Sequence, residues 1–190
     1  YGKGLNFYSH RSGRIYFMKN AELDDALSNQ YILSLFFDSH SNLWVGTLNG
    51  LFRINPRTGN LTNFSKTAAS PHQTDGSVFY CITEMADGKI WAGTKNNAIS
   101  VYNPQSDSIE YFDARGILER NDVFGISKGS GNEIWMTTNH GLVMFDPMNP
   151  LTSRQFNSFD GIQNDLFNPG AIFKDKGNDI YLGGINGLTI

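Results

Sequence analysis

Short apolar runs alternate with turn residues along the chain, and this alternation recurs at a regular interval. In "NLWVGTLNGLF" (42–52), one apolar run ends at Asn49-Gly50 and a second run follows. This is the pattern of a β-hairpin with an Asn-Gly turn, whose residues tolerate positive φ. Similar segments begin at residues 89, 133 and 179. The aromatic residues at the shared position are 47, 44 and 46 residues apart: Trp44, Trp91, Trp135 and Tyr181.

An interval in the mid-forties is typical of propeller blades or of helical repeats of the HEAT kind. The runs here are short and rich in β-branched and aromatic residues, which favours strands over helices. Each complete unit contains four runs, so we predict an all-β fold, a β-propeller of four-stranded antiparallel blades. The predicted blades are 30–65, 77–113 and 122–160, with partial blades at 1–29 and 165–190.

Two further features of the repeat predict its packing. Asn or Asp stands before Pro between the third and fourth strands of each blade, where its side chain can bond back to the turn backbone. These residues are Asn55, Asn103 and Asp146. Glycine follows the aromatic by two positions at Gly46, Gly93 and Gly183, which would let the next blade approach closely. We expect Trp44, Trp91 and Trp135 to pack between blades, because both faces of their strand are apolar.

The recurring segments resemble the two-component regulator propeller repeat. They read "SNLWVGTLNGLFRINP", "GKIWAGTKNNAISVYNP", "NEIWMTTNHGLVMFDP" and the shorter "NDIYLGGINGLTI". The third segment departs from the pattern with Thr137 in place of the glycine, and the second has Asn96-Asn97-Ala98 in its turn. Propellers of the WD, sialidase and kelch types fit less well, since their characteristic residues are missing.

Residues 159–190 look like the last propeller unit in the periplasmic sensor regions of hybrid two-component systems. In that family, two seven-bladed propellers precede an immunoglobulin-like domain, a transmembrane helix and a histidine kinase. The resemblance implies that this chain is the C-terminal part of the second propeller. It also implies a periplasmic location and a role in detecting oligosaccharides, with a signal across the membrane that controls transcription.

Composition limits the remaining classes of function. The formal net charge is −3, so the chain lacks the excess of basic residues that is typical of a nucleic-acid-binding protein. The single cysteine, Cys81, excludes an internal disulfide framework, and we expect it to be a small buried hydrophobic residue. No apolar run approaches the roughly 20 residues that span a bilayer, so we predict no membrane contact by this segment. The start at Tyr1, in the middle of the pattern, suggests a segment of a longer chain.

Catalytic and metal-binding patterns are missing from the sequence. The four histidines lie in different turns without ligand-like spacing, and the acidic group at 22–25 lacks the EF-hand arrangement. We therefore predict no catalytic residue, no metal and no cofactor. A catalytic pair of acidic residues for glycoside hydrolysis is an alternative that the sequence leaves open, because a propeller can bring residues of distant blades together. The histidines are His10, His40, His72 and His140, and the acidic group contains Glu22, Asp24 and Asp25.

A binding face is the better candidate. By the usual propeller convention, one face gathers the connections between blades and the turns between second and third strands. Amides, carboxylates and guanidinium groups on that face would satisfy sugar hydroxyls. We favour Arg120, Asp122 and His140, because their turns do not require those side chains. The other candidates, whose asparagines also suit tight turns for backbone reasons, are Asn49, Lys95, Asn97, Asn139 and Asn186.

The expected partners are an oligosaccharide, the remaining blades of the parent chain and a second copy of this segment. Strand edges left bare at the two partial blades would recruit complementary strands. Exchange of these ends between two copies gives a homodimer, whereas closure within one chain gives a strained four-bladed ring. A propeller that binds only other proteins is the alternative function, and a carbohydrate-active lyase or hydrolase is the less favoured one.

Overall fold

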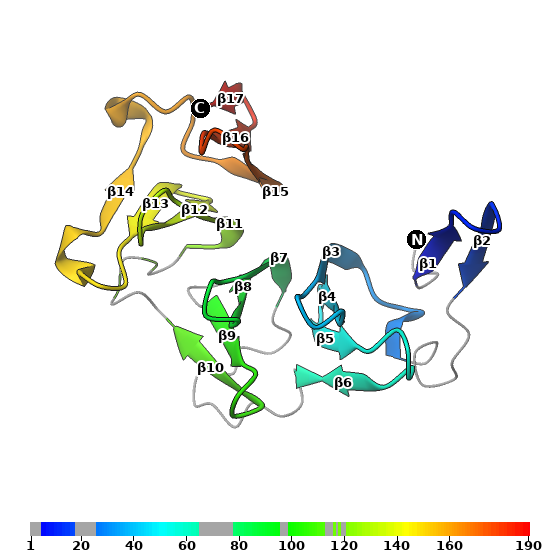
Figure 1. Ribbon diagram of the computed structural model, residues 1–190. Coiled ribbons are helices and arrows are strands. Elements are labelled where there is room, and N and C mark those ends of the chain that lie inside the picture. The colour runs from blue at the N-terminus through cyan, green and yellow to red at the C-terminus, as the bar shows by residue number, and fades with distance from the viewer. Residues whose placement is uncertain are drawn as a thin grey trace. The chain divides into compact units, whose positions relative to one another are not determined.

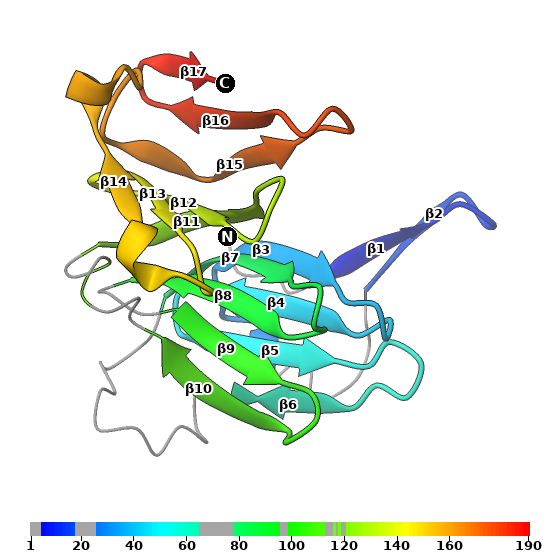
Figure 2. The same cartoon turned by 60° about the vertical axis from the view of Figure 1, so that its left-hand side comes forward.

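The computed structural model describes residues 5–17, 26–64, 78–95, 99–112, 116, 118 and 121–190. These residues form antiparallel sheets in which strands that follow one another along the chain lie side by side (Figures 1 and 2). The predicted all-β fold of four-stranded antiparallel blades is confirmed. The chain divides into two compact units, Tyr1–Val78 and Phe79–Ile190, and each is described by itself.

The first unit contains a hairpin and one complete blade. The hairpin pairs β1 (Asn6–Ser9) with β2 (Arg14–Phe17). The blade has the strand order β3-β4-β5-β6. Its strands are β3 (Ile32–Phe37), β4 (Leu43–Thr47), β5 (Gly50–Ile54) and β6 (Leu61–Asn63).

The second unit contains two four-stranded blades and a three-stranded sheet. The three sheets meet along their first strands, β7, β11 and β15, which lie closest to one another (Figure 1). The first blade comprises β7 (Phe79–Glu84), β8 (Ile90–Thr94), β9 (Ile99–Asn103) and β10 (Ser108–Phe112). The second comprises β11 (Val123–Lys128), β12 (Ile134–Thr138), β13 (Gly141–Phe145) and β14 (Arg154–Phe156). The third sheet comprises β15 (Phe167–Lys174), β16 (Ile180–Gly184) and β17 (Gly187–Thr189).

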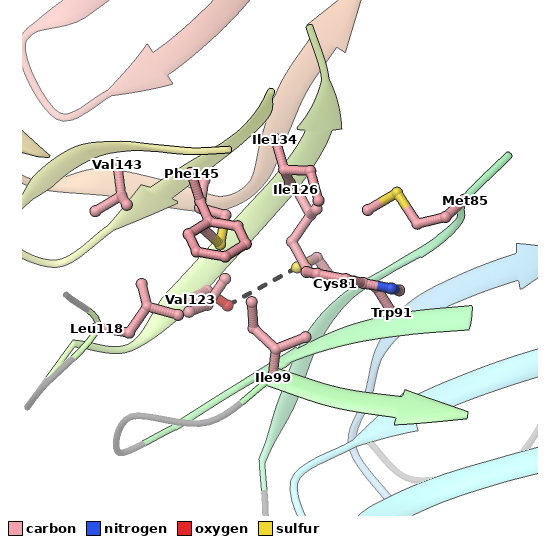
Figure 3. Packing of buried hydrophobic residues seen from close by; sticks show 11 residues of the cluster. Cys81, Met85, Trp91, Ile99, Leu118, Val123, Ile126, Ile134, Val143 and Phe145 are labelled. Atoms are coloured by element: carbon pink, nitrogen blue, oxygen red, sulfur yellow. Dashed lines mark hydrogen bonds between the residues drawn. The ribbon is translucent and has the colours of Figure 1, made fainter. Parts of the chain in front are cut away.

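The core of the second unit lies between its two complete blades (Figure 3). Side chains of β7–β9 there meet side chains of β11–β13 in one buried cluster. Cys81 is buried in this cluster, as predicted, and its thiol donates to the backbone oxygen of Val123 at 3.8 Å. Burial raises the pKa of Cys81 to about 12, so the side chain stays a neutral thiol.

Small residues on paired strands let neighbouring blades approach. A Cβ atom on Gly93 would lie 2.6 Å from the backbone oxygen of Val123, which confirms the predicted close approach at this glycine. Gly93 pairs with Cys81, whereas in the next blade Thr137 stands at the glycine position and pairs with Gly125. A Cβ on Gly125 would lie 2.7 Å from Ile172 of the following sheet. In the third repeat, the glycine of this residue pair therefore lies on the first strand, at Gly125, instead of on the second strand. This explains how the third repeat tolerates Thr137.

The repeated tryptophans pack in different ways. Each stacks or tilts against a phenylalanine from the end of its own blade, at centroid distances of 5.3, 5.4 and 5.7 Å. Trp91 belongs to the core cluster shared by two blades, so the prediction of packing between blades is confirmed for it. Trp135 is only half-buried, but it packs against a cluster of residues from β11, β13, β15 and β16, so the prediction of packing between sheets is confirmed for it as well. The pairs are Trp44–Phe64, Trp91–Phe112 and Trp135–Phe156.

The turns between third and fourth strands follow the prediction. The side-chain oxygens of Asn55, Asn103 and Asp146 accept backbone N–H groups two residues ahead, at 3.0, 2.9 and 2.9 Å. The last strand of the predicted blade 122–160 stops before the end of that range. It ends at Phe156, because Asn157 caps a 3₁₀ turn, η4 (Ser158–Asp160), through a capping box.

The Asn-Gly turns differ from the expectation in one respect. Only the glycine adopts positive φ, at 150° for Gly50, 109° for Gly141 and 125° for Gly187. Leu48 and Asn49 form the two-residue loop, and neither adopts positive φ, whereas Gly50 pairs with Thr47 as the first residue of β5. The side chain at the apex position is therefore not required by the backbone conformation.

A carboxylate at the opposite end of the first blade makes its stability depend on pH. Asp38 accepts hydrogen bonds from the side chains of Asn42 and Trp44, the latter at 2.8 Å from the indole nitrogen. Burial raises the pKa of Asp38, but these bonds and two backbone bonds outweigh burial and lower the pKa below its ordinary value.

We expect Asp38→Asn to be less stable than the parent protein at pH 7, with a difference that shrinks on acidification. Because the folded pKa lies below the unfolded one, the carboxylate stabilises fully above the unfolded pKa of about 4. This contribution is lost as the pH falls through the folded pKa. Urea unfolding at pH 7, 5 and 3 measures the difference. A difference that stays constant over this range would contradict the prediction.

Candidate binding site

The turn between β12 and β13 has a fixed backbone frame. The buried hydroxyl of Thr138 donates to the backbone oxygen of Gly141 at 2.8 Å and accepts the backbone N–H of His140 at 3.0 Å. Thr47 makes the same pair of bonds in the turn between β4 and β5, at 3.0 and 3.1 Å. Both turns thus satisfy their own backbone through a threonine that lies outside the two-residue loop.

The second loop residue of each turn contacts the segment that precedes the first strand of the same blade. His140 Nδ1 lies 2.9 Å from the side-chain oxygen of the buried Asn121. In the first unit, the side-chain nitrogen of Asn49 donates to Gln30 Oε1 at 3.1 Å. Both pairs are separated by 19 residues, so they are equivalent contacts in two blades.

Asp122 and Asn139 complete the polar group around His140. The backbone N–H of Asp122 donates to the side-chain oxygen of Asn139 at 2.6 Å. The hydroxyl of Tyr80, from the preceding blade, lies 3.5 Å from Asp122 Oδ2. Burial and the nearby charge of Asp122 raise the pKa of Tyr80, so the phenol keeps its proton and donates toward the carboxylate. We call Tyr80, Asn121, Asp122, Asn139 and His140 the polar cluster.

The segment that follows the β12–β13 turn also forms hydrogen bonds with this turn. Gln155 donates from its side chain to the backbone oxygen of His140 at 2.6 Å. The backbone oxygen of Asp165 accepts from Gly141 at 2.5 Å, and the carboxylate of Asp165 accepts the backbone N–H of Ser158 at 2.6 Å. The β12–β13 turn is therefore bonded to both the fourth strand and the connection to the next blade.

The structure places the predicted binding residues in three groups. It brings Asp122, Asn139 and His140 together, whereas Asn49 occupies the equivalent turn of the other unit. Lys95 and Asn186 are exposed, Lys95 directly after β8 and Asn186 between β16 and β17. Arg120 and Asn97 lie outside the described residues.

Sequence reasoning missed Tyr80 and Gln155 as members of the site. Gln155 lies 15 residues from His140, and Tyr80 lies 42 residues from Asp122, across two blades. The pattern of neighbouring residues in the sequence does not indicate which side chains of two different blades contact one another. The spacing of 19 residues shared by the two turn contacts is a signal that could have pointed to Gln30 and Asn121.

The polar cluster offers neutral and anionic hydrogen-bonding groups rather than a metal site. A carboxylate, an imidazole, amides and a phenol can together accept from and donate to the hydroxyl groups of a polar ligand. Within the described ranges, no group of three or more His, Cys, Asp and Glu residues is arranged to hold a metal ion. In the same part of the chain, no helix is both long and apolar enough to cross a membrane.

Comparison with known proteins identifies the repeat. Residues 26–49, which include β3 and β4, match the family model described as two component regulator propeller. Residues 26–49 are therefore similar to one two-component regulator propeller repeat. The resemblance noted from the repeated segments is confirmed, and the matched residues contain Gln30, Asn49 and the contact between them.

Known proteins with similar sequence or structure are much longer than this propeller segment. Histidine kinase P4 of Formosa agariphila is 27% identical over 171 residues, which cover 86% of this chain and 12% of the kinase. The extracellular domain of a hybrid two-component system from B. thetaiotaomicron matches with a TM-score of 0.76 and 22% identity, over 98% of this chain and 24% of that one.

An enzyme shares the propeller fold. Virginiamycin B lyase from Staphylococcus aureus matches with a TM-score of 0.66 and 16% identity, over 97% of this chain and 57% of the lyase. At this identity the similarity concerns the β-propeller fold alone. The propeller prediction is therefore confirmed by solved structures of different kinds.

Proposed function

We propose that this propeller segment belongs to the extracytoplasmic sensor region of a hybrid two-component histidine kinase and binds oligosaccharides without catalysing a reaction. Binding would signal across the membrane to control transcription. Support for the sensor comes from the matched repeat, from the similar histidine kinase and from the similar extracellular domain. The location that follows is the periplasm.

The observation that carries the binding role is the polar cluster. Three of its members, Asp122, Asn139 and His140, come from two segments that meet at one end of a blade. His140 is exposed, and its contact to Asn121 orients the imidazole before any ligand arrives. A polar, preoriented group of this kind suits a ligand with many hydroxyl groups, since each pair of hydroxyls needs matched donors and acceptors.

Thermal unfolding of the full-length protein with a panel of neutral and acidic oligosaccharides tests this proposal. A ligand that binds only the native state raises stability by about 2.7 kcal/mol at 100 times its Kd. We expect at least one oligosaccharide to raise the unfolding midpoint, and Asp122→Ala or His140→Ala to reduce the rise. Lys176→Ala, an exposed change in the β15–β16 turn, is the control and should leave it unchanged.

Two results would contradict the proposal. No change in midpoint with any oligosaccharide would remove the binding role. Turnover of an oligosaccharide that is abolished by substitution of one carboxylate would indicate a lyase or hydrolase instead.

A second candidate is a propeller that binds another protein, and β3 favours it. Alternate side chains of this strand are exposed and apolar, with exposed fractions of 40%, 55% and 61% for Leu33, Leu35 and Phe37. Apolar surface gathered on one strand is a common feature of protein-binding faces. Two results together would support this candidate over the sensor. The parent protein would bind no oligosaccharide, and Leu35→Asp would abolish its binding to a protein partner.

A further inference from the structure

Phe159 is the most exposed aromatic residue described in the chain. Its exposed fraction is 99%, whereas Phe145 and Phe167 of the same unit are buried. Burial of a phenylalanine stabilises a fold by about 1.5–3 kcal/mol, and Phe159 contributes none of this. Its ring is therefore available to a ligand or partner.

The turn that carries Phe159 is well defined by hydrogen bonds. Asn157 accepts the backbone N–H of Phe159 at 2.9 Å, and Asp160 accepts the backbone N–H of Asn157 at 3.0 Å. Arg154 forms an ion pair with Asp160 at 2.8 Å. Gly161 ends the turn in the left-handed region, with φ of 98°. These contacts fix the backbone at Phe159, so binding there would cost little ordering entropy.

Asp165 links this turn to the polar cluster. Its carboxylate accepts from Ser158, the residue before Phe159, and its backbone oxygen accepts from Gly141, the residue after His140. A single residue thus bonds to the immediate neighbours of both Phe159 and His140. Phe159 and the polar cluster therefore belong to the same end of the blade. Figure 2 shows the backbone path from β14 to β15 that carries Phe159.

We propose that Phe159 is the apolar platform of the oligosaccharide site, in contact with the C–H face of a sugar ring whose hydroxyls bind the polar cluster. This inference rests on the proposed function and extends it to a specific residue. A sugar presents hydroxyl groups at its edge and an apolar face, which matches a polar cluster beside an exposed ring. A purely apolar partner would remove water from the carboxylate of Asp122, which is costly for a charged group.

Phe159→Ala in the full-length protein tests the platform directly. Since the ring is exposed, the substitution should leave the unfolding midpoint of the free protein unchanged. We expect the Kd for each oligosaccharide that stabilises the parent protein to rise about tenfold by calorimetry. Phe159→Tyr keeps the aromatic face and should retain most of the affinity. Leu151→Ala, which changes another highly exposed apolar residue in η3 (Pro150–Thr152), is the matched control and should bind as the parent does.

The outcomes separate this inference from the proposed function. If the parent protein binds an oligosaccharide and Phe159→Ala binds it equally well, the platform is wrong and the binding function stands. If the parent protein binds none of the panel, the proposed function fails and the platform fails with it. If Phe159→Ala abolishes association with a protein partner while oligosaccharide affinity is unchanged, the ring belongs to a protein interface.

Discussion

Replacing Trp91 with alanine should lower the free energy of unfolding by about 3–5 kcal/mol, as large core truncations do. The indole belongs to the cluster shared by two blades and tilts against Phe112 at a centroid distance of 5.4 Å. Phe112 in turn meets Phe145 of the next blade at 5.0 Å. The cavity would therefore open in an aromatic row that joins two blades. Urea unfolding monitored by circular dichroism gives the change.

Trp135→Ala is the comparison for this experiment. Trp135 stands at the same repeat position and stacks on Phe156, but it is only half-buried. We expect its truncation to cost clearly less than that of Trp91. Equal losses for the two variants would show that the repeat position, rather than the degree of burial between blades, determines the contribution.

A single added methyl group at Gly93 should destabilise the second unit by about 1–3 kcal/mol, the usual cost of overpacking. The Cβ of Gly93→Ala would lie 2.6 Å from the backbone oxygen of Val123 and 2.6 Å from Cys81 Sγ. A backbone atom of the next blade cannot move aside without disturbing β11. Thermal unfolding measures the loss.

Gly177→Ala serves as the control for the methyl group at Gly93. Gly177 lies in the β15–β16 turn, where the nearest atom to an added Cβ is a side-chain oxygen of Asp175 at 3.2 Å. An oxygen at this distance needs to shift by only a few tenths of an ångström, so we expect a small effect. A loss at Gly177 as large as at Gly93 would rule out close blade approach as the cause.

The local features of the fold could be predicted from the sequence because they depend on neighbouring residues. The interval between aromatic residues predicted the blades, and Asn55, Asn103 and Asp146 predicted their own turns. Contacts between blades could not be read in this way. The half-buried state of Trp135 depends on what the adjacent sheet supplies, and the sequence pattern is the same as around Trp91.

The candidate site shows the same limit. Asp122 and His140 were predicted because their turns do not require those side chains, and Asn139 because it lies in a turn of the same face. The structure brings the three residues together. Tyr80 was missed because it reaches Asp122 from another blade. Phe159 was missed because its exposure depends on the 3₁₀ turn that follows the last strand of the predicted blade 122–160.

The way these turns satisfy their own backbone has an evolutionary consequence. In the β12–β13 turn, Thr138 and Gly141 carry the hydrogen bond and the unusual φ, so the two residues between them do not hold the loop closed. Point mutations at such positions can change which chemical groups a blade displays without opening the loop itself. A repeat of this kind can thus diversify its ligand preference one blade at a time. Within this one chain, the loops already carry three different pairs: Leu48-Asn49, Asn139-His140 and Ile185-Asn186.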